Sequence, residues 1–277
     1  SVTNAANSMF RSTFENSGLK RIPKNLFGGV VTLNANATSL FCRTFYNCQG
    51  LQDVPNALFS SITIGATSMF ELTFYNCILL PQIYDDWFSG ITTAANRMFY
   101  QTFQKCEALQ EIPDGLFGMQ SINTNTAQYM FFETFRECVG IKRVYKRLFA
   151  GITSGATHMF DGTFYGCTRL KEIGSDGDGL FRNISNTDST HTHMFYRTFY
   201  GCSNLLYVPA DTFARIPEGA SHMFDSTFYN CTGLEAIGDD LFKNIQTTTS
   251  SDTYMFYQTF YNCSSLSAIP DDTFAGI

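Results

Sequence analysis

Residues 255–270 read Met-Phe-Tyr-Gln-Thr-Phe-Tyr-Asn-Cys-Ser-Ser-Leu-Ser-Ala-Ile-Pro, and variants of this stretch recur along all 277 residues. The full unit is Met-Phe-x-x-Thr-Phe-x-x-Cys-x-x-Leu-x-x-Ile-Pro-x-x-Leu-Phe-x-x-Ile, followed by a polar link of variable length. Units start at 9, 40, 69, 98, 130, 159, 194, 223 and 255, with spacings of 29–35 residues. Such a period predicts a single continuous solenoid over 1–277, with nine coils that bury their apolar faces against each other.

Phenylalanine follows the repeat closely. The chain has 28 Phe residues, and all except Phe132 stand at three positions of the unit: after the opening Met, four residues later, and near the end. This gives three ladders of nine, one Phe per coil in each ladder. Aromatic side chains spaced in this way predict a core that runs the length of the solenoid.

The spacing inside one unit predicts its local structure. In the first unit Met9, Phe10, Thr13, Phe14 and Ser17 follow the i, i+1, i+4, i+5, i+8 pattern of one helix face. The segment 51–55 is too short for a helix and ends in Pro, which favours a short strand paired with the same strand of adjacent coils. Segment 58–62 suits one helical turn. We therefore expect an α+β repeat solenoid: short helix, short parallel strand, helical turn and loop.

The polar links carry a second, longer period. From the fourth unit onward, the distance from the third-ladder Phe to the next Met alternates between 13 and 10 residues. Asp161 and Asp225 follow short links, whereas Tyr196 and Tyr257 follow long ones. We expect this alternation to give one edge of the solenoid a two-coil repeat.

The string Thr-Phe-Tyr-Asn-Cys-x-x-Leu-x-x-Ile-Pro of residues 259–270 resembles the BspA-like leucine-rich repeat. The Met-Phe opening after a Thr/Asn-rich link is similar to related repeats of mycoplasma surface lipoproteins. The resemblance covers the whole chain and implies a leucine-rich-repeat-like solenoid on a bacterial or protist surface, used in adhesion or host contact. Thr in place of the usual Ala, a longer unit and the added Phe ladders depart from the family pattern.

Cysteine and threonine also occupy fixed positions, which predicts structural roles. Eight of the nine cysteines share one repeat position: Cys48, Cys77, Cys106, Cys138, Cys167, Cys202, Cys231 and Cys263. Parallel stacked thiols do not aim at each other, so we expect buried free thiols, with the extra Cys42 as the most exposed. Threonine recurs as Thr13, Thr44, Thr73, Thr102, Thr134, Thr163, Thr198, Thr227 and Thr259. Each buried hydroxyl is expected to bond a backbone carbonyl of its own or the adjoining coil.

Three further sets are candidate functional residues. A tyrosine row, able to contact a sugar or a partner protein, comprises Tyr46, Tyr75, Tyr165, Tyr200, Tyr229 and Tyr261. His158, His193 and His222 precede the Met of consecutive units beside Asp161 and Asp225; a transition metal is the alternative to a variable surface position, and we expect no metal. Asn36 and Asn183 open Asn-x-Ser/Thr motifs in the links and are candidate glycosylation sites.

Composition excludes some classes of function. Eighteen basic and 24 acidic residues give a net charge of −6 without a basic stripe, so nucleic acid is not an expected partner. No apolar run approaches the roughly 18 residues that span a bilayer, and membrane insertion is not expected. Polar residues recur as rows rather than as an asymmetric catalytic cluster, which argues against an enzyme. We expect no cofactor.

Two non-catalytic functions remain open. Only 15% of residues are charged and 16% are aromatic, which is typical of secreted or cell-surface repeats. Recognisable polar caps are absent from the sequence, which favours self-association of coils, end to end or side by side, into a surface filament or stalk. The alternative is an adhesin that binds a host protein or glycan along one edge.

Overall fold

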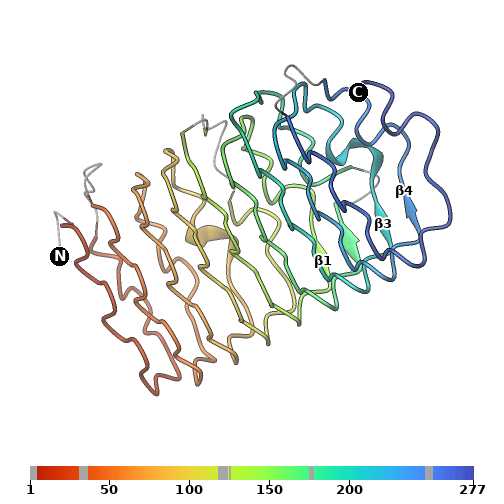
Figure 1. The fold of residues 1–277 in the computed structure, drawn as a ribbon. Coiled ribbons are helices and arrows are strands. Elements are labelled where there is room, and N and C mark those ends of the chain that lie inside the picture. Colours follow the sequence, from red (N-terminus) through yellow and green to blue (C-terminus); the bar gives the residue numbers. More distant parts are fainter. Residues whose placement is uncertain (1–4, 31–36, 118–123, 125, 175–177, 247–251) are drawn as a thin grey trace.

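The computed structural model describes residues 5–30, 37–117, 124, 126–174, 178–246 and 252–277. The chain forms successive coils that stack side by side, with the N- and C-terminal regions at opposite ends of the stack (Figure 1). This arrangement is the repeat solenoid that the 29–35-residue period predicts.

One side of the stack is a parallel sheet of very short strands. β1 (Arg143–Val144), β2 (Glu172–Ile173), β3 (Tyr207–Val208) and β4 (Ala236–Ile237) pair in that order, one strand from each of four consecutive coils. In every strand the first residue is exposed and the second is buried. Isolated parallel bridges such as Arg21↔Asp53 extend the same pairing toward the first coils. The predicted parallel strand is therefore confirmed.

The segment from the residue before Met to the Cys position is not a helix. No α-helix occurs among the described residues, so the predicted short helix is wrong. Backbone N–H groups alternate instead between two partners. In the second coil Cys42 and Thr44 bond the carbonyl three residues back, at 3.1 Å, whereas Phe41 and Arg43 bond carbonyls of the next coil, at 2.9 Å. We call this segment, residues 39–48 in the second coil, the tandem-turn ribbon.

A four-residue period explains why the ribbon resembles a helix in sequence. Every fourth residue has a positive φ near 55°, as at Ser39, Arg43 and Asn47, and each of the nine coils has three such positions. Apolar residues at i, i+1, i+4, i+5 and i+8 share one face of this ribbon as they would share one face of a helix. Over nine residues a period of 4 and a period of 3.6 place the same side chains inward.

The ribbon links the coils through five columns of hydrogen-bonded peptide groups. Five N–H groups of each coil donate to five carbonyls of the following coil, and all eight junctions between coils repeat this pattern at 2.7–3.1 Å. A single peptide group takes part at both faces of its coil: the Met69 carbonyl accepts from Phe41, and the adjoining Phe70 N–H donates to Met98. The hydrogen bonds that a helix would form inside one coil are thus formed between coils.

The last predicted element is mostly a single turn. The N–H of Ile62 bonds the Phe59 carbonyl at 2.9 Å, and the same Phe-x-x-Ile turn recurs in other coils. Short 3-10 helices precede it only at η1 (Asp85–Trp87) and η2 (Ala210–Thr212) among the described residues. The turn brings the third-ladder Phe back into the interior.

The three Phe ladders form the core. Successive rings of the first ladder stack with centroids 5.3–5.6 Å apart and interplanar angles of 9° or less. Third-ladder rings meet them from the opposite wall, as Phe149 meets Phe131 at 4.9 Å and 62°. The stack therefore combines parallel-displaced contacts between coils with edge contacts within them, both favourable geometries for aromatic pairs.

Candidate functional site

The repeated threonines complete the backbone hydrogen bonding of the ribbon. In coils two to nine each Thr Oγ1 donates to the first-ladder Phe carbonyl of the preceding coil at 2.8–2.9 Å. Thr13, in the first coil, donates to Phe10 of its own coil at 2.8 Å. These Phe carbonyls lie outside the five peptide columns, so a hydroxyl at this position uses an acceptor that would otherwise be under-bonded. These partners are the ones that burial of the hydroxyl predicts.

The repeated cysteines, four residues after the threonines, also donate hydrogen bonds to backbone carbonyls. Each of the eight thiols donates to a second-ladder Phe carbonyl of the preceding coil at 3.0–3.2 Å. All nine cysteines are free, and all are buried except the half-buried Cys263. The prediction that Cys42 is the most exposed thiol is wrong, because Cys42 is only 4% exposed and Cys263, in the last coil, is the more exposed. Burial raises the pKa of the Cys42 thiol to about 11 and that of Cys138 to about 12.

The tyrosine row forms two separate ring stacks, interrupted by Gln104 and Arg136 at the same repeat position. Tyr165, Tyr200, Tyr229 and Tyr261 follow each other at 4.6 Å, and Tyr46 lies 4.7 Å from Tyr75. The Arg136 guanidinium covers the far face of Tyr165 at 4.3 Å. Ring faces inside the row are therefore occupied, and a ligand would meet ring edges and hydroxyl groups.

The histidines form a second ring column on the ribbon. Tyr129, His158, His193, His222 and Tyr254 stack in this order with centroids 4.5–5.0 Å apart. Parallel rings place their nitrogens side by side rather than around one point. No group of three His, Cys, Asp or Glu side chains suited to hold a metal occurs in the described part of the chain.

The side chain that contacts each histidine alternates from coil to coil between Asp and Tyr, so the predicted two-coil repeat is present in the structure. A hydrogen bond of 2.7 Å joins His158 Nδ1 to the buried Asp161, and an identical bond joins His222 to Asp225. In the coil between them, Tyr196 replaces the Asp and meets the His193 ring edge-on at 5.5 Å. His193 Nδ1 is buried, without a hydrogen-bond partner among the described residues. Burial raises the pKa of the Asp161 carboxyl.

The unpaired imidazole makes stability depend on pH. Burial, and secondarily the flanking His158 and His222, lower the pKa of His193 to about 4, and Asp225 opposes this only weakly. An unfolded histidine titrates near pH 6.5. Between these values the unfolded chain binds a proton that the folded chain does not, so this stabilisation is complete above about pH 6.5 and is lost as the pH falls toward 4.

We expect His193→Tyr to remove this dependence while keeping the ring stack, because Tyr129 and Tyr254 occupy the same repeat position. Between pH 7 and 4.5 the unaltered chain should lose about 1 kcal/mol more stability than the variant, allowing for the partial exposure of the ring. Urea unfolding followed by circular dichroism at several pH values measures the difference. Equal pH dependence in both proteins would show that His193 titrates normally.

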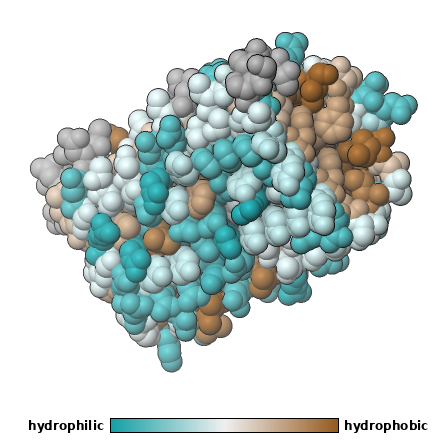
Figure 2. Space-filling model, in the orientation of Figure 1, coloured by the Kyte–Doolittle hydropathy of each residue, from teal (hydrophilic) through white to brown (hydrophobic). Residues whose placement is uncertain are grey.

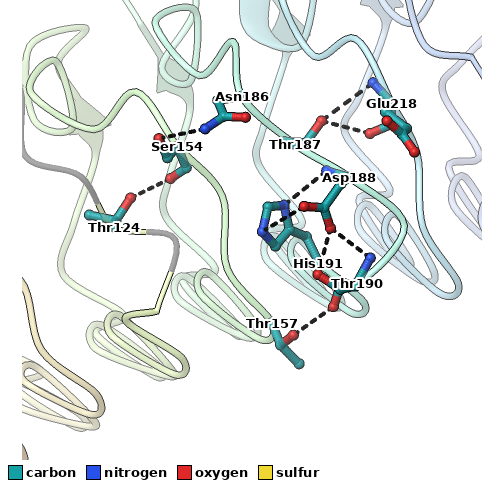
Figure 3. A network of polar contacts seen from close by, with 9 residues as sticks. All are labelled: Thr124, Ser154, Thr157, Asn186, Thr187, Asp188, Thr190, His191 and Glu218. Carbon is teal, nitrogen blue, oxygen red and sulfur yellow. Dashed lines mark hydrogen bonds and ion pairs between the residues drawn. The ribbon is translucent and has the colours of Figure 1, made fainter.

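The long link before His193 is held by a local polar network (Figure 3). His191 N–H donates to the Asp188 carbonyl at 3.1 Å, and the Asp188 N–H donates to His191 Nδ1 at 3.1 Å. Thr190 N–H donates to the Asp188 carboxylate at 2.8 Å, and Thr157 of the preceding coil donates to the Thr190 carbonyl at 2.8 Å. Residues 188–191 of the long link thus form a compact, internally bonded turn.

Of the two candidate glycosylation sites, Asn183 belongs to the described part of the chain. Asn36 lies outside the described residues. Asn183 is half-buried, and its Nδ2 donates to the Ala150 carbonyl of the preceding coil at 2.7 Å. A glycan on this nitrogen would have to replace that bond.

Sequence patterns did not single out a basic hollow on the strand side. Lys142, Arg169, Lys171 and Asn204 line a hollow of about 330 Å³ over three consecutive coils. Lys142 lies 27 residues before Arg169 and 29 before Lys171, and Asn204 lies 33 residues after Lys171, so the stacking of coils brings these three segments together. Among the described residues, no helix is long and apolar enough to cross a membrane.

Comparison with known proteins places the chain beside leucine-rich repeat proteins. No protein-family model and no curated protein matches it. A leucine-rich repeat protein from Bacteroides ovatus is 16% identical with a TM-score of 0.34, over 96% of this chain and 70% of that one. The T. pallidum leucine-rich repeat protein is 18% identical with a TM-score of 0.32, over 91% and 77%.

A third solved structure is a leucine-rich cell surface protein from Faecalibacterium prausnitzii, 16% identical with a TM-score of 0.28, over 97% of this chain and 82% of that one. Leucine-rich repeat proteins from bacteria are thus the class of solved structure to which this chain is similar.

Proposed function

We propose that this chain is a non-catalytic, extracellular structural repeat protein that assembles by stacking coils of one molecule on coils of another. The observation that carries the proposal is the five-column hydrogen bonding of the ribbon. Every coil offers carbonyls on its N-terminal face and N–H groups on its C-terminal face. The following coil can therefore belong to the same chain or to another molecule.

The outer coils have the groups that such a contact would use. Within the described residues, the carbonyls of Met9 and Thr13 accept no backbone bond, and the N–H groups of Phe256 and Phe260 donate none. Continued stacking would pair these two rows as the inner junctions pair theirs. A heterologous contact that repeats without closing produces a filament.

Side chains favour the same contact. Hydrophobic groups gather at the C-terminal end of the stack, whereas most of the visible face is hydrophilic (Figure 2). The exposed apolar residues there include Ile269, Phe274 and Ile277. Asparagine amides also form ladders, in which Asn47 donates to Asn16 at 2.7 Å and Asn262 donates to Asn230 at 2.8 Å. Asn262 Oδ1 and Asn16 Nδ2 are the groups that would continue this ladder between molecules.

Electron microscopy of the purified chain over a dilution series tests the proposal. We expect rods whose length grows with concentration in steps of nine coils, roughly 45 Å at the spacing of paired strands. Phe256→Asp should leave single rods, because it places a charge on the stacking face. Leu79→Asp carries the same charge change on an exposed residue away from that face and should assemble normally. Single rods of the unaltered chain at every concentration would refute the proposal.

A further inference from the structure

We propose that the basic hollow on the strand side binds an acidic saccharide, with the carboxylate held by Lys142, Arg169 and Lys171 and a sugar ring placed on Tyr207. This site lies on the sheet side of the stack and is independent of the coil faces that would join molecules.

Like charges are concentrated around this hollow. Lys142 and Lys171 directly precede β1 and β2, and the Lys171 N–H bonds the Lys142 carbonyl at 2.9 Å. Cations directly side by side on paired strands destabilise a sheet. Arg169 adds a third positive charge to the lining of the same hollow. A bound anion would remove this repulsion.

Among the described residues, these three cations lack the carboxylate partners that their neighbours have. Arg143 pairs with Glu172 at 2.5 Å and Lys146 pairs with Asp178 at 2.6 Å. Within the described residues no ion pair joins Lys142, Arg169 or Lys171 to a carboxylate; Lys142 Nζ lies 3.5 Å from Gln110 Oε1. All three are exposed, so their charges are available to a ligand.

An apolar and aromatic surface lies beside the charges. Leu206 holds the same repeat position as Lys171 in the next coil, and its N–H donates to the Lys171 carbonyl at 3.2 Å. The next residue, Tyr207, pairs in register with Glu172. Leu206 is 42% exposed and Tyr207 is 45% exposed. Unlike the tyrosine row, Tyr207 has no ring contact among the described residues, so its faces are free to pack on the C–H face of a sugar.

The hollow favours a saccharide over an acidic peptide or a nucleic acid. A peptide gains much of its affinity by adding a strand to an open sheet edge. Here β2 and β3 are paired on both sides, which leaves only side chains for contact. Three cations in a chain of net charge −6 do not provide the extended basic surface that a phosphate backbone needs. A volume of about 330 Å³ suits one or two sugar rings.

Calorimetric titration of the full chain with a short oligogalacturonate tests the site, with its methyl ester as a neutral control of the same shape. We expect binding to the acid that weakens with salt, and none to the ester. The triple variant K142A/R169A/K171A should bind at least 10-fold more weakly. The triple variant R11A/K24A/R215A makes the same charge change at scattered exposed positions and should bind within two-fold of the unaltered chain. Tyr207→Ala should weaken binding about five-fold with the salt dependence preserved.

Three results would overturn the proposal. The first is no binding of the acidic oligosaccharide. The second is an equal loss of affinity in the two triple variants, which would show that the acid is attracted to positive charge anywhere on the protein. The third is tighter binding of polyglutamate than of oligogalacturonate without dependence on Tyr207, which would identify an acidic peptide as the ligand.

Discussion

Replacing Phe131 with alanine is expected to lower the free energy of unfolding by about 3–5 kcal/mol. The ring is fully buried in the middle coil and contacts four others: Phe99 and Phe160 in its own ladder and Phe117 and Phe149 opposite. A cavity there interrupts the stack in both directions, because each coil is stabilised chiefly by its neighbours. Urea unfolding by circular dichroism, with hydrogen exchange to locate the weakened coils, measures the effect.

The matched control is Phe10→Ala, at the same repeat position in the first coil. Phe10 is only half-buried and contacts Phe27 and Phe41. Its replacement should cost about 1–2 kcal/mol and loosen the first coil alone. Equal losses in the two variants would contradict a core held together by contacts on both faces of a coil.

Replacing Gly140 with alanine is expected to cost about 2–3 kcal/mol although it adds a single methyl group. A Cβ at this position would lie 2.5 Å from the Glu107 carbonyl oxygen and 2.6 Å from that of Leu109. Both atoms belong to the backbone of the preceding coil, so they can move only if the junction between the coils opens. Thermal and urea unfolding of the variant measure the loss.

Gly50→Ala is the matched control, because Gly50 holds the same repeat position three coils earlier. The nearest atom to its added Cβ is the Leu19 carbonyl oxygen at 3.6 Å, an ordinary contact. We expect a change within about 0.5 kcal/mol, or a small gain from the stiffer unfolded chain. If Gly140→Ala were equally harmless, the approach of coils four and five would be looser than the structure indicates.

The solenoid is predictable from the sequence because the same pattern occurs nine times. Nine units with Phe at three fixed positions define one interior regardless of the local backbone. The parallel strand was predictable for a similar reason: Val54-Pro55 ends a segment too short for a helix, and equivalent segments of neighbouring coils must lie together. Burial of the Thr hydroxyls then required carbonyl partners, and the first-ladder Phe carbonyls supply them.

The ribbon was misassigned because side-chain spacing does not report where the backbone hydrogen bonds go. A signal was present in the residue types. The last positive-φ position of the ribbon is Asn or Gly in seven of nine coils, as at Asn47 and Gly166. Asn and Gly tolerate the left-handed conformation best and are poor choices for a helix interior. A column of Asn and Gly at one repeat position therefore indicates tandem turns.

Candidate site residues were predictable only where they repeat. The stacked histidines stood out because they share one position in consecutive units. Lys142 and Lys171 also share one repeat position in consecutive units, but most other units have unrelated residues there, and Arg169 is the only basic residue at its own repeat position. Their proximity depends on the register of β1 with β2, and their lack of carboxylate partners depends on which side chains lie beside them in the stack.

The five peptide columns also give the solenoid a net dipole moment along its axis. Every ribbon N–H between coils points toward the C-terminal coils, so the peptide dipoles, each about 3.5 D, add along the axis. The strand side adds little, because its bonds run both ways, as in Ile22 N–H to Asp53 and Gln52 N–H to Lys20. The ninth-coil face is therefore the positive pole, the reverse of the chain sense in an α-helix. Two stacks that meet with opposite faces attract, whereas two that meet with identical faces oppose like poles.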